Sequence, residues 1–426
     1  MFKRVPGTKD ILPGEVEAWQ KLETLSRNIF STHNYREIRP PLIEDASLFN
    51  RSLGESTEIV QKQMFLIKKE EDVYALRPEG TASIVRAYIE NNLDKTHGFV
   101  KLFYMGPMFR MERPQKGRLR QFHHIGCEAL GSVEPDLDIE MISLADSLLK
   151  AYAIGGYTIV INSLGCAEDK LALNRMLQEK LSSRTGELCE DCKVRFQRNI
   201  LRILDCKHEQ CRAIVNSLDI RDKYLCEACK AHFTYVREGL DLLGVACEVS
   251  PHLVRGLDYY TRTVFEIKHG QLGPQQDALG AGGRYDTLVK QLGGPDTGAI
   301  GFAFGVERLL LAAQAADGAE SRQPAGGNLV YLIALGAVAR KQGMNILANL
   351  RSSGIAADTD YEAKSLKAAM RKANDLNARW VVLLGDNELQ EKVAAVKDMR
   401  NSTQEKVNLS GLSGYFKGKI NEAGTV

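Results

Sequence analysis

The stretch from Phe109 to Phe122 has the residue types best suited to binding a nucleotide. It holds four arginines and one lysine around a proline and a glycine, with an aromatic residue at each end. Guanidinium groups bind phosphate oxygens in a bidentate manner, and a phenylalanine ring can stack on a base. The stretch therefore predicts a triphosphate and nucleobase site or an RNA contact, and the alternative is a solvated basic loop.

Cysteine is the second residue type whose spacing suggests chemistry. The chain has nine cysteines, and six of them lie between Cys189 and Cys229. Two Cys-x-x-Cys pairs, Cys189 with Cys192 and Cys226 with Cys229, could close a tetrahedral zinc site, although their spacer is longer than in compact zinc ribbons. Zinc binding and buried reduced thiols both remain open, whereas an odd cysteine count argues against a secreted disulfide scaffold.

The elements that must position these residues divide into a front part and a back part. Small, polar and turn-forming residues at 321–327 predict a linker. Beyond it, 328–426 alternates apolar strands with helices, one of them expected over 364–376. This alternation predicts a small α/β domain with a mixed or parallel sheet.

The front part has apolar strands separated by long polar loops, which predicts an α+β fold with an antiparallel sheet. The clearest strands are expected at 101–105, 155–162 and 263–267. Between 167 and 244 the pattern becomes helical and charged, so we expect a helical insertion there. The front domain would then comprise 1–166 and 245–320.

Composition and charge limit the classes of function. The chain has 426 residues, enough for about three domains. Its formal net charge is +2, so local patches rather than overall basicity must hold any nucleic-acid partner. No apolar run reaches the roughly 18 residues of a membrane helix, and no apolar signal stretch follows Met1. We therefore expect a cytoplasmic protein without a membrane partner.

Three segments resemble the motifs of class II aminoacyl-tRNA synthetases. The run 109–122 resembles motif 2, and 301–309 resembles motif 3, with a glycine before a helix that carries an arginine. Motif 1 is matched more loosely by 38–42. The three occur in the order of that class, which is far more specific than any one of them alone.

Four further segments resemble one family within this class, the histidyl-tRNA synthetases of the bacterial type. They lie at 253–261, 281–286, 6–10 and 76–81. The resemblance covers the whole chain. It implies a class II catalytic domain built on an antiparallel sheet, the helical insertion, and a C-terminal α/β domain that binds the anticodon.

The resemblance also implies which residues bind histidine. Glu79 and Thr81 would hold the α-amino group, Glu128 and Tyr259 would grip the imidazole ring, and Tyr260 would complete the pocket wall. The other residues implied in histidine binding are Gly80, Arg110, His124 and Arg255. A buried carboxylate beside the imidazole would select for histidine, because apolar side chains would leave its charge unpaired.

For the reaction with ATP, the resemblance implies three catalytic arginines. Arg110 would bind the α-phosphate and the substrate carboxylate, Arg308 the far phosphates, and Arg255 the reacting phosphate. The other residues implied in ATP binding are Glu112, Arg118 and Phe122. In addition, Arg113 and Gln115 would approach the acceptor end of the tRNA.

The sequence departs from the family pattern at His124, where the family has glutamine. A neutral imidazole has one donor and one acceptor, so it replaces the amide only in part. A protonated His124 would repel the substrate ammonium group. We therefore expect activity to fall more steeply at mildly acidic pH than in a His124→Gln variant.

The implied reaction joins histidine and ATP into histidyl-adenylate and then transfers histidine to the 3' end of tRNA(His). ATP would be accompanied by Mg²⁺, no resident metal ligand is expected in the site, and the motif 1 region would form a homodimer. The alternative is a non-catalytic histidine-binding paralogue that regulates histidine biosynthesis. The presence of all three arginines and of a separate C-terminal domain disfavours it.

Overall fold

A computed structural model describes the protein in two compact units. The described residues are 2–54, 57–115, 117–273, 278–316, 327–362 and 365–423. The units are Met1–Ala319 and Glu320–Val426, and each is considered by itself. Of the linker predicted at 321–327, all but the last position lies outside the described residues.

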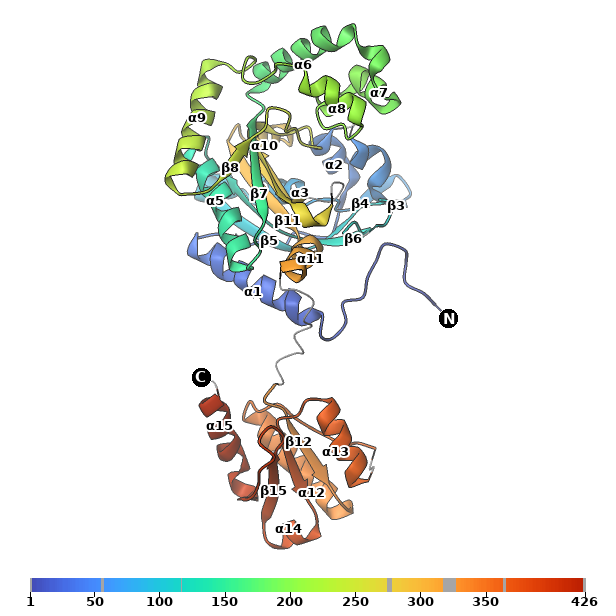
Figure 1. Cartoon of the computed structure of the whole chain (residues 1–426), viewed down its shortest axis with the longest axis vertical. Coiled ribbons are helices and arrows are strands. Elements are labelled where there is room, and N and C mark those ends of the chain that lie inside the picture. Colours follow the sequence, from blue (N-terminus) through green and yellow to red (C-terminus); the bar gives the residue numbers. More distant parts are fainter. Residues whose placement is uncertain are drawn as a thin grey trace. The chain divides into compact units, whose positions relative to one another are not determined.

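An eight-stranded sheet forms the centre of the first unit (Figure 1). In spatial order its strands are β1 (Arg36–Glu37), β5 (Val100–Phe109), β6 (Gln121–Leu130), β11 (Ala299–Gly305), β10 (Ala278–Arg284), β9 (Thr261–His269), β7 (Tyr157–Ser163) and β8 (Cys247–Val249). The pairings of β1 with β5 and of β7 with β8 are parallel, and the five pairings between them are antiparallel. The predicted antiparallel sheet is confirmed, and its three predicted strands overlap β5, β7 and β9.

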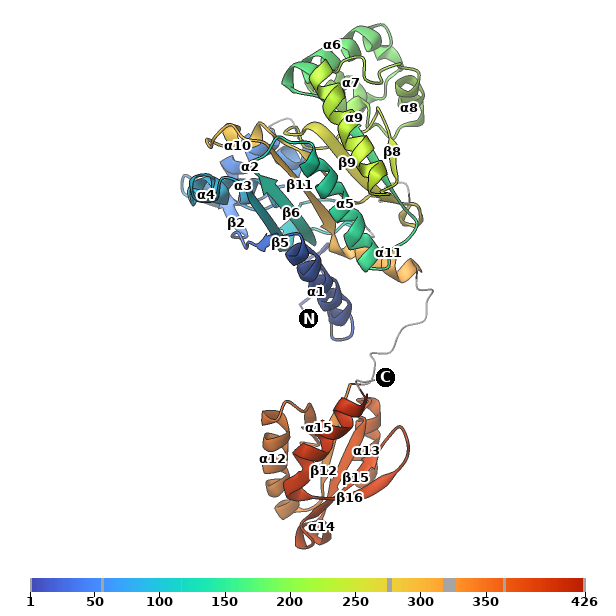
Figure 2. The same ribbon diagram turned by 90° about the vertical axis from the view of Figure 1, so that its left-hand side faces the viewer.

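Helices cover both faces of this sheet (Figure 2). On one face, α1 (Val16–Thr32), α5 (Asp136–Ala151) and α11 (Val306–Ala316) share a core with strand residues such as Phe103 and Phe302. On the other face, α2 (Ala46–Leu53), α3 (Thr81–Glu90) and α10 (Leu288–Gln291) pack with Tyr104 and Met108. Burial on both sides explains why the strands read as apolar runs rather than as alternating patterns.

A smaller sheet stands beside α2 and α3. Its order is β2 (Ile43–Asp45), β4 (Asp72–Leu76) and β3 (Phe65–Lys69), all antiparallel. A π-helical turn at Ile59–Gln63 leads into β3, and a short helix α4 (Leu93–His97) leads into β5. Asp45 starts α2 because its side chain accepts a hydrogen bond from the Ser47 amide at 2.8 Å.

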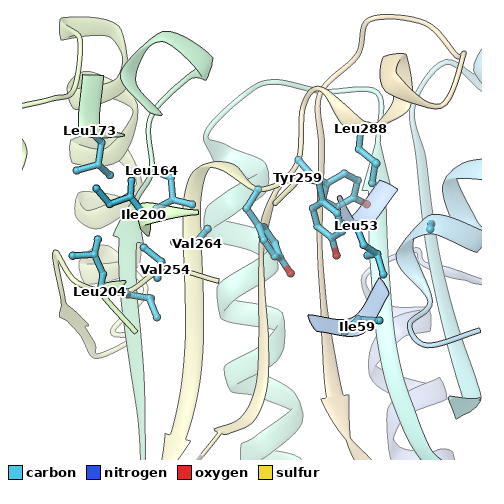
Figure 3. Packing of buried hydrophobic residues seen from close by; sticks show 14 of the residues in the cluster. Leu53, Ile59, Leu164, Leu173, Ile200, Leu204, Val254, Tyr259, Val264 and Leu288 are labelled. Atoms are coloured by element: carbon cyan, nitrogen blue, oxygen red, sulfur yellow. The ribbon is translucent and has the colours of Figure 1, made fainter. Parts of the chain in front are cut away.

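The segment predicted as a helical insertion forms four α-helices in the first unit. They are α6 (Ala167–Ser182), α7 (Glu190–Arg198), α8 (Glu209–Asn216) and α9 (Glu227–Leu242), with short 3₁₀ turns at Thr185–Glu187 and Ile200–Ile203. Figure 3 shows Leu173, Ile200 and Leu204 beside Val254 and Val264 of the sheet domain. These side chains belong to one continuous apolar cluster, so the insertion and the sheet share a core.

The second unit is a mixed sheet with helices on both faces. Its strands, in spatial order, are β13 (Ala357–Thr359), β12 (Val330–Ala334), β14 (Trp380–Leu384), β15 (Val393–Asp398) and β16 (Gln404–Asn408). One apolar cluster includes residues of α12 (Ala337–Ser352) and α15 (Leu412–Ala423), and the other includes residues of α13 (Leu366–Asp375). A short helix α14 (Asp386–Gln390) follows β14. The predicted α/β character is confirmed.

The helix expected over 364–376 is observed as α13. It begins at Leu366 because the Ser365 hydroxyl accepts a hydrogen bond from the Ala368 amide at 3.4 Å, which caps the helix. Residue 364 lies outside the described residues.

Candidate active site

A cleft in the first unit collects side chains from distant parts of the sequence. The cleft is open to solvent, and its empty space, including the solvent at its mouth, measures about 1000 Å³. Strands β5, β6, β10 and β11, the starts of α3 and α11, and the loops 110–120 and 253–260 contribute to its lining. The predicted site residues that line it are Glu79, Gly80, Thr81, Arg110, Glu112, Arg118, Phe122, His124, Arg255, Tyr259, Tyr260 and Arg308.

Glu79 stands at the start of α3 and is almost completely buried. Its carboxylate accepts hydrogen bonds from the backbone amides of Thr81 at 2.7 Å and Ala82 at 2.8 Å. Gly80 is required between them, because a Cβ atom there would lie 2.3 Å from the ring of Tyr104. Burial raises the pKa of Glu79, and the two amides and Arg110 act against this rise. The helix N-terminus therefore holds an acidic group against the cleft.

Glu128, on β6, lies directly behind the cleft wall. One of its oxygens accepts a hydrogen bond from the Thr81 hydroxyl at 2.7 Å, and the other accepts one from the Tyr285 hydroxyl at 2.6 Å. Thr81 and Tyr285 line the cleft themselves. Burial raises the pKa of Glu128 to about 8, although both hydrogen bonds lower it. The site thus contains a carboxyl group that is mostly protonated at neutral pH.

Tyr259 and Tyr260 form an aromatic wall at the end of the loop before β9. Their ring centroids are 4.7 Å apart, and the ring of Tyr259 meets that of Tyr285 edge-on at 5.6 Å. Figure 3 shows Tyr259 in the apolar cluster that also holds Leu53 and Leu288. Both tyrosines are nearly fully buried, and burial raises the pKa of each, so they stay neutral hydrogen-bonding groups.

Arg110 extends from the end of β5 into the cleft. Its Nε atom donates to the Pro78 carbonyl at 2.9 Å, and its guanidinium carbon lies 5.3 Å from the centroid of the Phe122 ring. Burial lowers the pKa of Arg110, and nearby Glu112 and Glu79 counteract this. An arginine remains charged despite such a shift, so the carbonyl and the ring hold a fixed cation in the cleft.

Arg308 is the second cation of the cleft and lies in the first turn of α11. It donates to the carbonyl of Gly117 at 3.2 Å and to that of Ala278 at 2.6 Å. Within the 110–120 loop, the carboxylate of Glu112 lies 3.5 Å from the guanidinium group of Arg118 and 3.9 Å from that of Arg110. These contacts bring the basic loop and α11 together around one space.

Arg255 is the third predicted catalytic arginine, in the loop before β9. Its Nη1 atom lies 2.5 Å from a carboxylate oxygen of Glu266. Burial lowers the pKa of Arg255, but the Glu266 and Tyr260 side chains more than offset this, and the net shift is upward. Its Nε atom is buried and has no hydrogen-bond partner in the described structure. The guanidinium group of Arg255 thus lines the cleft with one N–H unsatisfied, which is costly in the absence of a ligand.

The expectation that His124 becomes protonated at mildly acidic pH is wrong. Burial, together with the positive charges of Arg110 and Arg308, lowers the pKa of His124 to about 3. The imidazole therefore stays neutral through the physiological range and cannot repel a substrate ammonium group. The residue lines the cleft, and its Nδ1 atom is buried and lacks a hydrogen-bond partner in the described part of the chain.

The two residues predicted to approach the tRNA lie outside the cleft. Arg113 and Gln115 are exposed, in the loop that joins β5 to β6. Gln115 exchanges two backbone hydrogen bonds with Arg118, at 3.0 and 2.9 Å, so the loop folds back on itself at this point. Arg118 is thereby tied both to this turn and to the cleft.

The structure adds three residues that sequence reasoning did not place in the site. Tyr104 and Tyr285 line the cleft. Glu307, at the start of α11, accepts hydrogen bonds from the His123 amide at 3.0 Å and from its ring at 2.9 Å, and so fixes α11 against β6. Tyr285 lies within the 281–286 signature and Glu307 within the 301–309 segment, so a signal for both existed. No motif indicated Tyr104.

This arrangement defines the class of protein. An antiparallel sheet carries an arginine-rich loop between two adjacent strands, and a further arginine starts the helix that follows a neighbouring strand. Arg110 of the loop and Arg308 of the helix line the same cleft. This is the arrangement of the catalytic domain of a class II aminoacyl-tRNA synthetase.

Comparisons with known proteins identify the family within this class. The family model for histidyl-tRNA synthetase matches residues 7–309, and that for the anticodon binding domain matches residues 329–419. The chain belongs to the histidyl-tRNA synthetase family.

Relatives of known activity or structure cover nearly the whole chain. A histidine–tRNA ligase of Desulforamulus reducens is 45% identical and is aligned over 98% of this chain and 99% of its own length. One from Halothermothrix orenii is 44% identical over 95% of this chain and 96% of its own. The crystal structure of apo histidyl-tRNA synthetase from S. aureus is 33% identical, with a TM-score of 0.80, and covers 98% of this chain and 100% of its own.

Proposed function

We propose that this chain activates L-histidine with ATP to form histidyl-adenylate and transfers histidine to the 3' end of tRNA(His). The observation that carries the proposal is one cleft lined by Arg110, Arg255, Arg308 and the buried Glu79, with the carboxyl group of Glu128 directly behind its wall. Relatives that are histidine–tRNA ligases over their full length support it.

Histidine would bind at the closed side of the cleft. The Glu79 carboxylate supplies an anion for the α-ammonium group, and the Nδ1 atom of His124 supplies an acceptor or donor, depending on its tautomer. Glu128 and Tyr259 would bind the two imidazole nitrogens, with Tyr260 as the wall. A ligand without polar ring atoms would bury polar groups of the pocket, such as the Tyr259 hydroxyl, without a hydrogen-bond partner from the ligand, which disfavours it by about 1–3 kcal/mol.

ATP would occupy the basic side of the cleft. Phe122 would support the adenine ring, Arg308 the far phosphates, and Glu112 and Arg118 the nucleotide between them. The histidine carboxylate would attack the α-phosphorus and pyrophosphate would leave, while Arg110 and Arg255 stabilise the charge on the reacting phosphate. No general base is needed, because the attacking carboxylate is already ionised at neutral pH. Mg²⁺ would enter with ATP as part of the substrate, where it neutralises phosphate charge.

Transfer to tRNA would use the exposed turn of the 110–120 loop and the second unit. A 3'-terminal ribose hydroxyl attacks the acyl carbon of the adenylate, and AMP leaves. Arg113 and Gln115 lie exposed on this loop and are available to the acceptor end, and the match of 329–419 to an anticodon binding domain supports a role in reading the anticodon. A tRNA substrate implies that the chain works in the cytoplasm, where translation takes place.

We further propose that the chain forms a homodimer through the segment after β1. Support comes from four exposed aliphatic side chains on or next to the small sheet, which follows this segment. They are Leu42, Ile43, Leu66 and Ile67. Sedimentation equilibrium should give twice the chain mass. Ile43→Arg should shift the protein to monomer, while Leu171→Arg, at an exposed leucine of α6, should not. A monomeric parent protein would refute the dimer.

The function is tested by ATP–pyrophosphate exchange with each of the twenty amino acids. We expect exchange with histidine alone, followed by charging of tRNA(His) when tRNA is added. No exchange with any amino acid, together with histidine binding measured by calorimetry, would instead favour the non-catalytic regulatory paralogue. The structure provides no separate observation in favour of that paralogue, since all three arginines are present at the cleft.

A further inference from the structure

The helical insertion contains a compact group of thiols away from the active-site cleft. It is called here the four-cysteine cluster and consists of Cys189, Cys192, Cys206 and Cys211. Their sulfur atoms all lie within 4.8 Å of one another. The grouping differs from the one that sequence spacing suggests, because Cys226 and Cys229 are not part of it and gather elsewhere with Cys166 and Asp169.

The spacing of the sulfur atoms fits a single tetrahedral ion. With zinc–sulfur bonds of about 2.3 Å, the sulfur atoms of a tetrahedral site are about 3.8 Å apart. The Sγ atoms of Cys189 and Cys206 are 3.9 Å apart. This distance is nearly twice the length of a disulfide bond, which is about 2.05 Å. A polynuclear iron–sulfur cluster would need its ligands spread around several metal atoms, which the mutual closeness of the thiols does not allow.

The backbone around the cluster is arranged to stabilise thiolates. Cys189 directly precedes the first residue of α7, Cys192 is in the first turn of α7, and Cys211 is in the first turn of α8. The amide of Cys189 donates to the Cys211 sulfur at 3.2 Å, and the amide of His208 donates to the Cys206 sulfur at 3.4 Å. Helix N-termini and N–H to sulfur hydrogen bonds both favour the deprotonated form that binds a metal.

Most of the cluster is shielded from solvent. Cys192 and Cys211 have no measurable exposure, Cys206 is 8% exposed, and Cys189 is partly buried. Four thiolates this close together would repel one another strongly unless a cation between them compensated for their charge.

The cluster lies where short elements meet at the edge of the shared apolar core. The cluster joins α7, of nine residues, the 3₁₀ turn Ile200–Ile203, and α8, of eight residues. Helices shorter than about 12 residues are marginal unless tertiary contacts hold them. A metal that ties both helix N-termini to the loop between them supplies such contacts, as structural zinc does in other small modules.

From these observations we propose that the four-cysteine cluster binds one structural Zn²⁺ ion. All four thiols are ligands, so the site is closed and has no position for a substrate or water. The ion holds the starts of α7 and α8 together, and it takes no part in histidine activation. The proposal does not depend on the function proposed above.

The second group does not carry the same inference. Its carboxylate, Asp169, already accepts hydrogen bonds from the amides of Cys166 at 3.2 Å and Cys226 at 2.9 Å. These bonds cap α6 and join it to the start of α9, and Cys226 is exposed. The geometry of this group is therefore explained by helix capping without a metal.

The test is the zinc content of the untagged full-length protein, purified without chelator and measured by inductively coupled plasma mass spectrometry. We expect Cys206→Ser to contain one zinc per chain less than the parent protein. Cys247→Ser, which changes a cysteine outside both groups, should keep the parent content. A parent protein with less than about a tenth of one zinc per chain, or equal contents in the parent and Cys206→Ser, would overturn the proposal.

Two measurements on the parent protein keep the test decisive if Cys206→Ser does not fold. Reconstitution with Co²⁺ should give the intense visible bands and the near-ultraviolet sulfur charge-transfer bands of a tetrahedral tetrathiolate. Weak octahedral bands would refute the site. Thiol titration in denaturant with chelator but without reductant should find all nine cysteines free. A deficit of two or more would show disulfides instead of a metal site.

Discussion

At the scale of single residues, the active site is distinguished by buried acids that have no cation paired with them. Glu79 and Glu128 are 4% and 1% exposed, and among the described residues neither carboxylate lies within ion-pair distance of a cation. Hydrogen bonds from Thr81, Ala82 and Tyr285 offset only part of the cost of burying them. The folded protein therefore carries a destabilising feature that histidine binding would relieve, a common property of functional sites.

This cost makes stability depend on pH through Glu128. The carboxyl group has a pKa of about 8 when folded against 4.5 as the ordinary value. Between these values the folded chain holds a proton that the unfolded chain releases, so the contribution of Glu128 to stability is full below pH 4.5 and declines as pH rises toward 8. Relative to Glu128→Gln, the free energy of unfolding of the parent protein should fall by on the order of a few kcal/mol between pH 4.5 and pH 8.

Urea unfolding of both proteins at pH 5, 6, 7 and 8 measures this difference. Glu248→Gln on β8, an exposed position, is the control and should show a constant difference from the parent protein. Unfolding free energies of the parent and Glu128→Gln that stay parallel across the range would contradict the raised pKa. Glu128→Gln should also weaken histidine activation.

The low pKa of His124 leads to a prediction opposite to the one made from sequence. The imidazole is neutral above a pH of about 3. The rates of histidine-dependent ATP–pyrophosphate exchange by the parent protein and by His124→Gln should therefore follow parallel pH profiles between pH 5.5 and 8. The KM for histidine should fall by about tenfold at most in the variant, since the amide adds one hydrogen bond worth about 1 kcal/mol. An additional acidic limb in the parent profile alone would contradict this.

Sequence reasoning identified most cleft residues because they lie in contiguous motifs. It failed where the meaning of a residue depends on a distant neighbour. The charge state of His124 is set by burial and by Arg308, which is 184 positions away, and the role of Tyr285 is set by Glu128 on another strand. Spacing along the chain carries no information about either neighbour.

At the scale of elements, the insertion supports the loop that carries Arg255, Tyr259 and Tyr260. Lys170 on α6 donates to the carbonyls of Asp258 at 2.9 Å and Tyr260 at 3.0 Å. Asn199, between α7 and the 3₁₀ turn, donates to the Asp258 side chain at 2.9 Å. The insertion therefore contacts the proposed histidine pocket through this loop.

Lys170→Met should loosen this loop. Two hydrogen bonds from a cation to backbone carbonyls would be lost, each contributing about 1.5–3 kcal/mol. Lys170 touches neither proposed substrate site directly and acts as a positioning residue. Its loss should therefore raise the KM for histidine by about tenfold or more and change that for ATP much less.

Steady-state exchange kinetics with each substrate varied in turn measure both constants. Lys180→Met, at an exposed position on the same helix, should leave both unchanged. Equal rises of the two KM values in Lys170→Met would indicate a general structural defect rather than loss of loop positioning.

The order and type of the elements were largely predictable, because apolar runs and turn residues mark them locally. The packing of these elements against one another was less predictable from the sequence. The pairing of Cys226-x-x-Cys229 with Cys189-x-x-Cys192 was the natural choice from spacing. The fold instead brings Cys226 beside Cys166, because α9 starts near the start of α6. Helix packing decides this, and helix packing depends on contacts between segments far apart in sequence.

At the scale of the whole molecule, the two units have separate cores. The second unit contains its own five-stranded sheet, with an apolar cluster on each face. The cleft residues all belong to the first unit. Adenylate formation and tRNA recognition are therefore expected to be physically separable.

A protein ending at residue 319 should keep histidine-dependent pyrophosphate exchange and lose most tRNA charging. The cleft is complete within 1–319, so kcat and KM for exchange should stay within a few-fold of the full chain. Charging of tRNA(His) should fall on the order of 100-fold or more, because each tenfold loss in affinity corresponds to about 1.4 kcal/mol of removed RNA contacts. Adding residues 320–426 as a separate chain should not restore charging, since the effective concentration provided by the covalent link is lost.

If a folded 1–319 protein charged tRNA as well as the full chain, the second unit would have no role in tRNA recognition. If it folded but lost exchange, the cleft would depend on contacts from beyond residue 319.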